Sequence, residues 1–121
     1  MRHWTDVITE SNKGLDERQL KRDVSAIFNS MYRQKVRAGR AAFSSLEDLA
    51  YNGMIKDEKI KVSQDTMDLL KWAIAKPEFK SRMMLYLKSM NRSVALLKQA
   101  ALAMVDELPK YGQGHLHPDR Q

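Results

Sequence analysis

The clearest hydrophobic pattern in the first half of the chain lies within residues 15–37. Leu20, Val24, Ile27 and Met31 recur at steps of four, three and four residues. This is the spacing of side chains along one face of an α-helix. The pattern therefore predicts a first helix over residues 15–37 that buries one face and exposes the other.

A second helix is predicted beyond residues 38–40, where the sequence Ala-Gly-Arg interrupts the first helix. Residues 44–47 read Ser-Ser-Leu-Glu, the spacing of a capping box, in which the serine and glutamate side chains bind free backbone N–H groups. Gly53 is the residue type that commonly follows the end of a helix. We expect this helix to begin at the capping box, with a start at Arg40 as the alternative.

Residues 54–62 are the one stretch with a strand pattern, because Ile60 and Val62 alternate with Lys59 and Lys61. The stretch is short, and a pair of short strands is marginally stable unless it packs on helices. We therefore expect an irregular connection here, with a short β-pair as the alternative.

The second half of the chain predicts two further helices. Ser63 is suited to cap a helix over residues 64–75, and Pro77 is suited to end that helix and begin the next. The last helix is expected to run unbroken over residues 77–108. Its apolar positions alternate at steps of four and three, and they are Met83, Leu87, Met90, Val94, Leu97, Ala101, Met104 and Leu108. The positions beside them are mostly uncharged, which favours the core of a bundle over a two-stranded coiled coil. Dimerisation through this helix is the alternative. With the helix in the core, we expect at most a weak homodimer formed through a residual face.

Together these elements predict an all-α, mainly α fold: a compact bundle of about four helices with a long C-terminal helix. A length of 121 residues suits one domain. We expect an N-terminal arm at residues 1–14, a single helical domain at 15–109 and a flexible C-terminal tail at 110–121.

Composition narrows the chemistry and the location. The chain has no cysteine, which excludes disulfides and thiolate chemistry and suits a reducing compartment. Neither a signal peptide nor an apolar run of about 20 residues that could cross a bilayer is present in the sequence. We predict a cytoplasmic protein that does not bind membranes.

No enzyme signature is found in the sequence. It contains no glycine-rich phosphate loop, no His-Glu-x-x-His and no Gly-x-Ser-x-Gly motif. His115, His117 and Asp119 stand close together near the C-terminus, but they lack the number and spacing of ligands that a metal site needs. We expect a protein with no catalytic activity, no cofactor and no metal.

Charge is the most informative remaining feature. The net charge is +6, and it is spread unevenly: residues 1–40 hold nine Lys or Arg against five acids, and residues 76–121 hold eight against four. Residues 41–75 reverse the sign, with four bases and six acids. Two basic segments that flank an acidic one favour a polyanionic partner.

The basic segment within residues 32–40 suggests where such a partner would bind. On a helix over residues 15–37, four arginines lie opposite the buried stripe: Arg18, Arg22, Arg33 and Arg37. The first pair lies about 22 Å from the second, a separation over which one straight helix could touch two backbone segments of a duplex. Arginine offers phosphate a rigid fork of donors. The predicted nucleic-acid-binding residues are Arg18, Arg22, Arg33, Lys35, Arg37 and Arg40. An ordinary solvent-exposed face, on which Asp16 and Asp23 pair with these cations, is the alternative.

We therefore predict a small, basic, non-enzymatic nucleic-acid-binding protein, such as an accessory or regulatory subunit of a ribonucleoprotein or DNA complex. It would contact mainly backbone phosphates. Duplex DNA is favoured over RNA because Trp4, Tyr32 and Tyr111 are the only aromatic residues expected to be free for stacking on bases. The alternative is an adaptor or inhibitor that binds a partner protein through its helical surface, supported by the acidic segments 46–49 and 56–59 and by the eight methionines.

Overall fold

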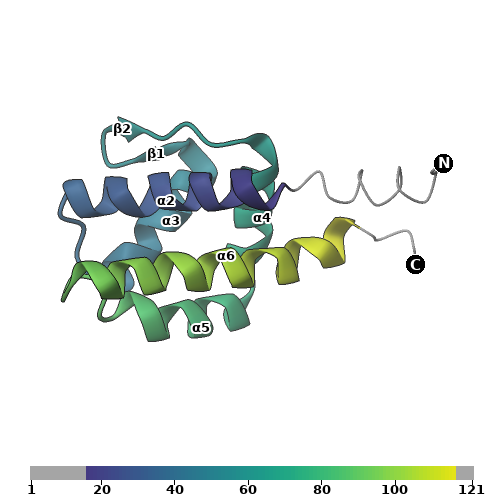
Figure 1. Ribbon diagram of the computed structural model, residues 1–121. Coiled ribbons are helices and arrows are strands. Elements are labelled where there is room, and N and C mark those ends of the chain that lie inside the picture. The colour runs from purple at the N-terminus through teal and green to yellow at the C-terminus, as the bar shows by residue number, and fades with distance from the viewer. Residues whose placement is uncertain (1–15, 117–121) are drawn as a thin grey trace.

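The computed structural model describes the backbone of residues 16–116 and the side chains of residues 16–111. Within this range the chain forms five helices and one short antiparallel hairpin, which confirms the mainly α fold (Figure 1). The helices are α2 (Glu17–Arg33), α3 (Arg40–Asn52), α4 (Gln64–Ile74), α5 (Pro77–Leu87) and α6 (Val94–Leu116). The strands are β1 (Met54–Ile55) and β2 (Glu58–Lys59). The predicted arm at residues 1–14 lies outside the described residues.

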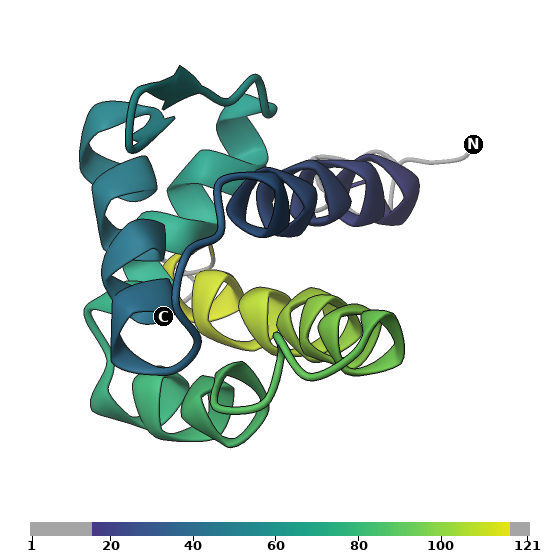
Figure 2. The same ribbon diagram turned by 90° about the vertical axis from the view of Figure 1, so that its left-hand side faces the viewer.

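Helix α6 lies against α2, α4 and α5, and α3 packs on α4, α5 and β1 (Figure 2). The core between them contains three phenylalanines among its largest fully buried side chains. The rings of Phe43 and Phe79 lie 6.2 Å apart between centroids, and Tyr111 meets Phe79 edge-on at 5.5 Å. These aromatic contacts connect α3, α5 and α6, so one core is shared by segments that are far apart in the sequence.

Helix α2 buries the predicted stripe, but it ends at Arg33 and not at residue 37. Its end is a Schellman motif, a turn in which two N–H groups bind back to carbonyls of the last helical turn. The N–H of Val36 donates to the Met31 carbonyl at 2.9 Å, and the N–H of Lys35 donates to that of Tyr32 at 3.1 Å. Val36 and Met31 are both buried. The helix stops there because the turn brings Val36 back into the core.

The second helix begins at Arg40, which was the alternative start, so the predicted capping box at residues 44–47 was wrong. Ser44, the expected cap, lies inside the helix, and the neighbouring Ser45 is buried there. Gly39 makes the earlier start feasible, because its φ of 80° is accessible to glycine at little cost. The N–H of Gly39 donates to the Leu87 carbonyl at 2.9 Å, which ties this turn to the end of α5.

The prediction of an irregular connection at residues 54–62 was also wrong, since the two strands pair there with Ile55 opposite Glu58. The hairpin is stable because it is held against α2. Ile55 is fully buried, and its carbonyl accepts a hydrogen bond from the Gln34 side chain at 2.9 Å. Glu58 accepts from Ser30 at 2.9 Å and forms an ion pair with Arg33.

Asp23 connects α2 to the start of α4. Ser63 caps α4, as predicted, by accepting the N–H of Thr66 on its side-chain oxygen at 3.3 Å. Asp23 is 3% exposed and accepts hydrogen bonds from the Ser63 N–H, the Ser63 hydroxyl and the Thr66 hydroxyl. A fourth bond comes from Gln19 at 2.8 Å. These donors satisfy the buried carboxylate, which also lies near the positive end of the α4 dipole.

The single long helix predicted over residues 77–108 was wrong, because the chain breaks at residues 88–93 and reverses direction. Two polar side chains stabilise the break. The Ser93 hydroxyl accepts the N–H of Leu96 at 3.1 Å, and the Asn91 amide donates to the Val36 carbonyl at 3.0 Å. Met90 is buried inside the break. α5 and α6 therefore pack on each other, and α6 then continues through Pro109 to Leu116, past the end predicted at residue 108.

Candidate nucleic-acid interface

The structure divides the predicted arginine face. Arg18 and Arg22 are exposed on the N-terminal half of α2. Arg33, the last residue of α2, is ion-paired with Glu58 of the hairpin, so its charge is already balanced. Arg37 lies beyond the end of the helix. The prediction that four arginines share one straight helical face was therefore wrong, because the Schellman turn removes Arg37 from that face.

The supposed local partners of the arginines also differ from the sequence interpretation. Asp16 caps α2 by accepting the backbone N–H of Arg18 at 3.0 Å, and Asp23 is buried and bonded to residues of α4. Neither carboxylate has a described ion pair with an arginine of α2. The alternative of a face neutralised by Asp16 and Asp23 is therefore not what the described residues form.

Three connections meet instead at one end of the bundle, which faces the viewer in Figure 2. They are the α2–α3 connection at residues 34–39, the hairpin turn at 56–57 and the α5–α6 connection at 88–93. Three hydrogen bonds hold the first connection to the hairpin turn, to the α5–α6 connection and to the last residue of α5. Lys56 donates to the Gln34 carbonyl at 3.1 Å, the Asn91 amide donates to the Val36 carbonyl at 3.0 Å, and the Gly39 N–H donates to the Leu87 carbonyl at 2.9 Å.

A pair of exposed cations accompanies each of these hydrogen bonds. Lys35 and Lys56 stand at the first, Arg37 and Arg92 adjoin the second, and Arg40 and Lys88 adjoin the third. Each of the six is either part of the bond or the direct sequence neighbour of a residue in it. We call this set the basic end, and it consists of Lys35, Arg37, Arg40, Lys56, Lys88 and Arg92.

Few opposite charges lie near the basic end. Residues 34–40 and 88–93 contain no Asp or Glu, and the first turns of α3 and α6 contain none either. In the hairpin, Asp57 is exposed, while Glu58 is engaged by Arg33. Two helices begin and two end at this side, so their dipoles oppose one another. The positive potential therefore comes from the side-chain charges.

Two of these lysines adopt a backbone conformation that is unfavourable for lysine. Lys35 and Lys56 both have a φ of 55°, and they are the non-glycine residues with positive φ in the part of the chain that the structure describes. Glycine or asparagine would occupy these positions with less strain. Both strained positions carry a positive charge and lie at the same end of the molecule, an arrangement that stability alone does not favour.

The sequence prediction found half of this set. Lys35, Arg37 and Arg40 were identified because they lie close together in the sequence. Lys56, Lys88 and Arg92 were missed because only the folded chain brings them near the other three. Asn91 and Ser93, beside the apolar heptad positions, gave a weak signal, because their side chains can hydrogen-bond backbone groups in place of the helical hydrogen bonds.

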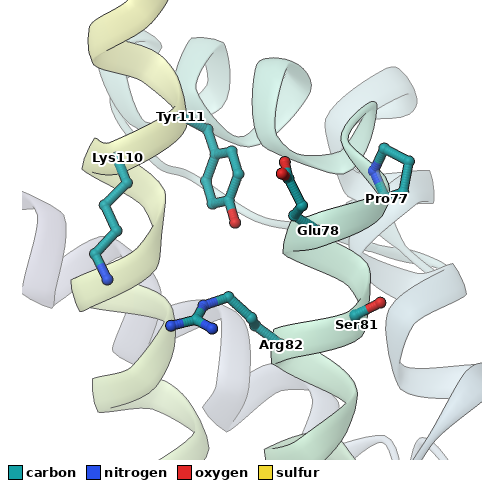
Figure 3. A pocket seen from close by; sticks show the side chains of 6 residues that line it. All are labelled: Pro77, Glu78, Ser81, Arg82, Lys110 and Tyr111. Atoms are coloured by element: carbon teal, nitrogen blue, oxygen red, sulfur yellow. The ribbon is translucent and has the colours of Figure 1, made fainter.

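A pocket between α5 and α6 is a second place where charged side chains meet (Figure 3). It has a volume of about 560 Å³, and Figure 3 shows the Arg82 guanidinium and the Tyr111 ring directed into the space between the two helices. Arg82 and Lys110 both bind the buried carboxylate of Glu107, at 3.2 and 3.4 Å, and Glu78 lines the rim. Since the two cations are balanced by two acids, this pocket does not attract a polyanion.

Partial burial and the nearby carboxylates of Glu107 and Glu78 raise the pKa of Tyr111, while Arg82 opposes the shift. The phenol therefore keeps its proton at neutral pH. No group of three or more metal-binding side chains occurs among the described residues. The side chains of His115, His117 and Asp119 lie outside them.

The fold defines a small mainly α protein with a hairpin packed on its first described helix. No protein-family model, curated protein or solved structure matches the chain. None of the helices in residues 16–116 has the length and apolar character needed to cross a membrane.

Proposed function

We propose that this protein is a non-enzymatic nucleic-acid-binding accessory or regulatory subunit that grips backbone phosphates with its basic end. The observation that carries the proposal is the convergence of three connections that bring six exposed cations together with little opposing charge. Exposed Lys and Arg side chains release counterions when they neutralise phosphates, and this release drives binding. A chain without cysteine fits action in a reducing compartment such as the cytoplasm.

Two triple variants with equal changes of charge test this function. In the first, Arg37, Arg40 and Arg92 of the basic end are changed to Glu. In the second, Lys21, Lys61 and Lys71, which are exposed elsewhere on the molecule, are changed to Glu. Binding of a fluorescent 12-nucleotide DNA is measured by anisotropy over a range of salt concentrations. The comparison separates the position of the charges from the total charge.

For the parent protein, contacts to roughly five phosphates of this single strand give a log–log slope of affinity against salt of about −3 to −4. The basic-end variant should lose about two from the magnitude of that slope, about 0.7 for each cation removed. The control variant should keep most of it. Absence of binding by the parent at low salt would refute the function, and equal losses in the two variants would refute the site.

A second candidate function rests on exposed apolar side chains of α5 and α6. Leu85 is 68% exposed, Leu102 is 58% exposed and Val94 is 53% exposed. Large exposed apolar residues of this kind support binding to a partner protein or weak self-association. Under this function, changing Leu85 and Leu102 to Asp abolishes partner capture or self-association, while the basic-end triple variant leaves both intact. Nuclease treatment before a pull-down separates a protein partner from one held through nucleic acid.

A further inference from the structure

Two exposed tyrosines precede two of the connections that form the basic end. Tyr32 lies in the last turn of α2 and is 51% exposed, and Tyr86 lies in the last turn of α5 and is 40% exposed. The Tyr32 carbonyl accepts the N–H of Lys35 at 3.1 Å, and the Tyr86 carbonyl accepts the N–H of Ser89 at 3.3 Å. Each tyrosine is therefore within one turn of a basic-end lysine, Lys35 or Lys88.

This placement differs from the sequence expectation on which duplex DNA was favoured. Tyr111 is half-buried and packs on Phe79, while Tyr86, which was not considered, is exposed. The straight helix over residues 15–37 that could touch two backbone segments of a duplex does not form either, because α2 ends at Arg33. The structure therefore does not support the earlier preference for a duplex.

We propose that the basic end binds single-stranded nucleic acid, with Tyr32 and Tyr86 each stacking on a base while the neighbouring cations hold the intervening phosphates. The proposal rests on the proposed function and specifies its ligand. Complementarity supports it: an unpaired strand presents both negative phosphates and free base faces, whereas a duplex has its base faces already stacked on one another. A surface that carries both cations and exposed aromatic rings matches the first of these ligands.

The experiment uses three labelled probes with the same number of nucleotides per strand: twelve thymidines, a strand of twelve abasic nucleotides and a 12-base-pair duplex. The abasic strand keeps the phosphates but has no bases. The parent should bind the thymidine strand about a hundredfold more tightly than the abasic strand, about tenfold for each of the two stacked bases, and more tightly than the duplex, because stacking adds to the phosphate contacts. A strand of twelve uridines then shows whether DNA or RNA is preferred.

Point variants locate the stacking. Tyr32→Ala and Tyr86→Ala should each weaken binding of the thymidine strand by about tenfold and leave binding of the abasic strand unchanged. Tyr32→Phe and Tyr86→Phe should retain affinity, because a phenyl ring stacks as a phenol does. Tyr51→Ala is the matched control, since Tyr51 is 68% exposed but is followed by Asn52 and Gly53, not by a cation.

The outcomes distinguish failure of the single-strand inference from failure of the proposed phosphate-binding function. If the parent binds the abasic and thymidine strands equally, or prefers the duplex, the single-strand inference is wrong while phosphate binding stands. Equal effects of the Tyr51, Tyr32 and Tyr86 alanine variants would also overturn it. If the parent binds none of the probes at low salt, the proposed function itself fails.

Discussion

Lys35 occupies the position that glycine usually takes in a Schellman motif. In this motif the residue after the helix cap adopts the left-handed conformation, and Lys35 does so with a φ of 55°. A side chain in that conformation costs about 1 kcal/mol or more relative to glycine. The charge of Lys35 therefore has a stability cost, and the same holds for Lys56 in the hairpin turn.

We predict that Lys35→Gly raises the free energy of unfolding by about 0.5–1 kcal/mol, since relief of strain exceeds the extra entropy of an unfolded glycine. The same change should weaken binding to a single-stranded oligonucleotide. Urea denaturation and anisotropy measure the two effects on one protein. Lys35→Ala is the control, because it removes the charge but keeps the strain, so it should weaken binding without raising stability. A fall in stability for Lys35→Gly would contradict the argument.

The lysine at position 35 also explains why the sequence did not predict the correct end of α2. The apolar stripe of α2 was predicted because Leu20, Val24, Ile27 and Met31 follow helical spacing, and all four are buried. The end of the helix was misplaced because its turn contains lysine where a glycine would have been recognised. By contrast, Ser63 and Pro77 were correctly assigned, since each has a side chain whose local effect at a helix start is direct.

At the scale of elements, the heptad spacing of residues 83–108 was real, but it does not belong to one helix. Met83 and Leu87 project from α5, Met90 lies in the connection, and Leu97 projects from α6. All of these side chains reach the same core because the chain reverses between the two helices. Sequence spacing alone cannot separate this arrangement from an unbroken helix, since the break depends on a tertiary hydrogen bond from Asn91 to Val36.

Val94 and Leu97 provide a matched test of this arrangement. Both occupy the predicted apolar stripe, but Leu97 is 6% exposed and Val94 is 53% exposed. We expect Leu97→Ala to lower the free energy of unfolding by about 2–5 kcal/mol, the cost of a cavity in a packed core. Val94→Ala should change it by less than about 0.5 kcal/mol.

Thermal and urea denaturation of both variants measure the difference. If α5 and α6 formed one continuous helix with an unbroken apolar face, the two substitutions would be comparably destabilising. A mild effect at Leu97 together with a large one at Val94 would contradict the described packing.

At the scale of the whole molecule, the fold brings together positive charges that are far apart in the sequence. The cations of the basic end come from three separate segments, and the hydrogen bonds between those segments fix them near one another. Half of the set could be identified from the sequence, because Lys35, Arg37 and Arg40 are local. The other half could not, since the register in which α5 and α6 pack on the rest decides where Lys88 and Arg92 lie.

Like charges held close together repel, so the basic end should reduce stability when no polyanion is bound. We predict that Arg37→Glu raises the melting temperature by a few degrees at low ionic strength, because a carboxylate would then face the remaining cations of the basic end. The expected gain is below about 1 kcal/mol, as for other exposed charges. Lys71→Glu is the control with the same change of net charge. Lys71 follows Asp68 by one helical turn, so its reversal should lower the melting temperature or leave it unchanged.

The dependence on salt concentration shows whether charge repulsion causes the rise in melting temperature of Arg37→Glu. The Debye length falls from about 30 Å at 0.01 M to about 3 Å at 1 M, so repulsion among exposed side chains is largely screened at the higher concentration. The difference in melting temperature between the parent and Arg37→Glu, measured by calorimetry, should therefore disappear as salt is raised. A gain that persists at 1 M salt would mean that Arg37 acts through packing. Equal shifts for Arg37→Glu and Lys71→Glu would mean that total charge matters, and that the described fold does not concentrate it at one end.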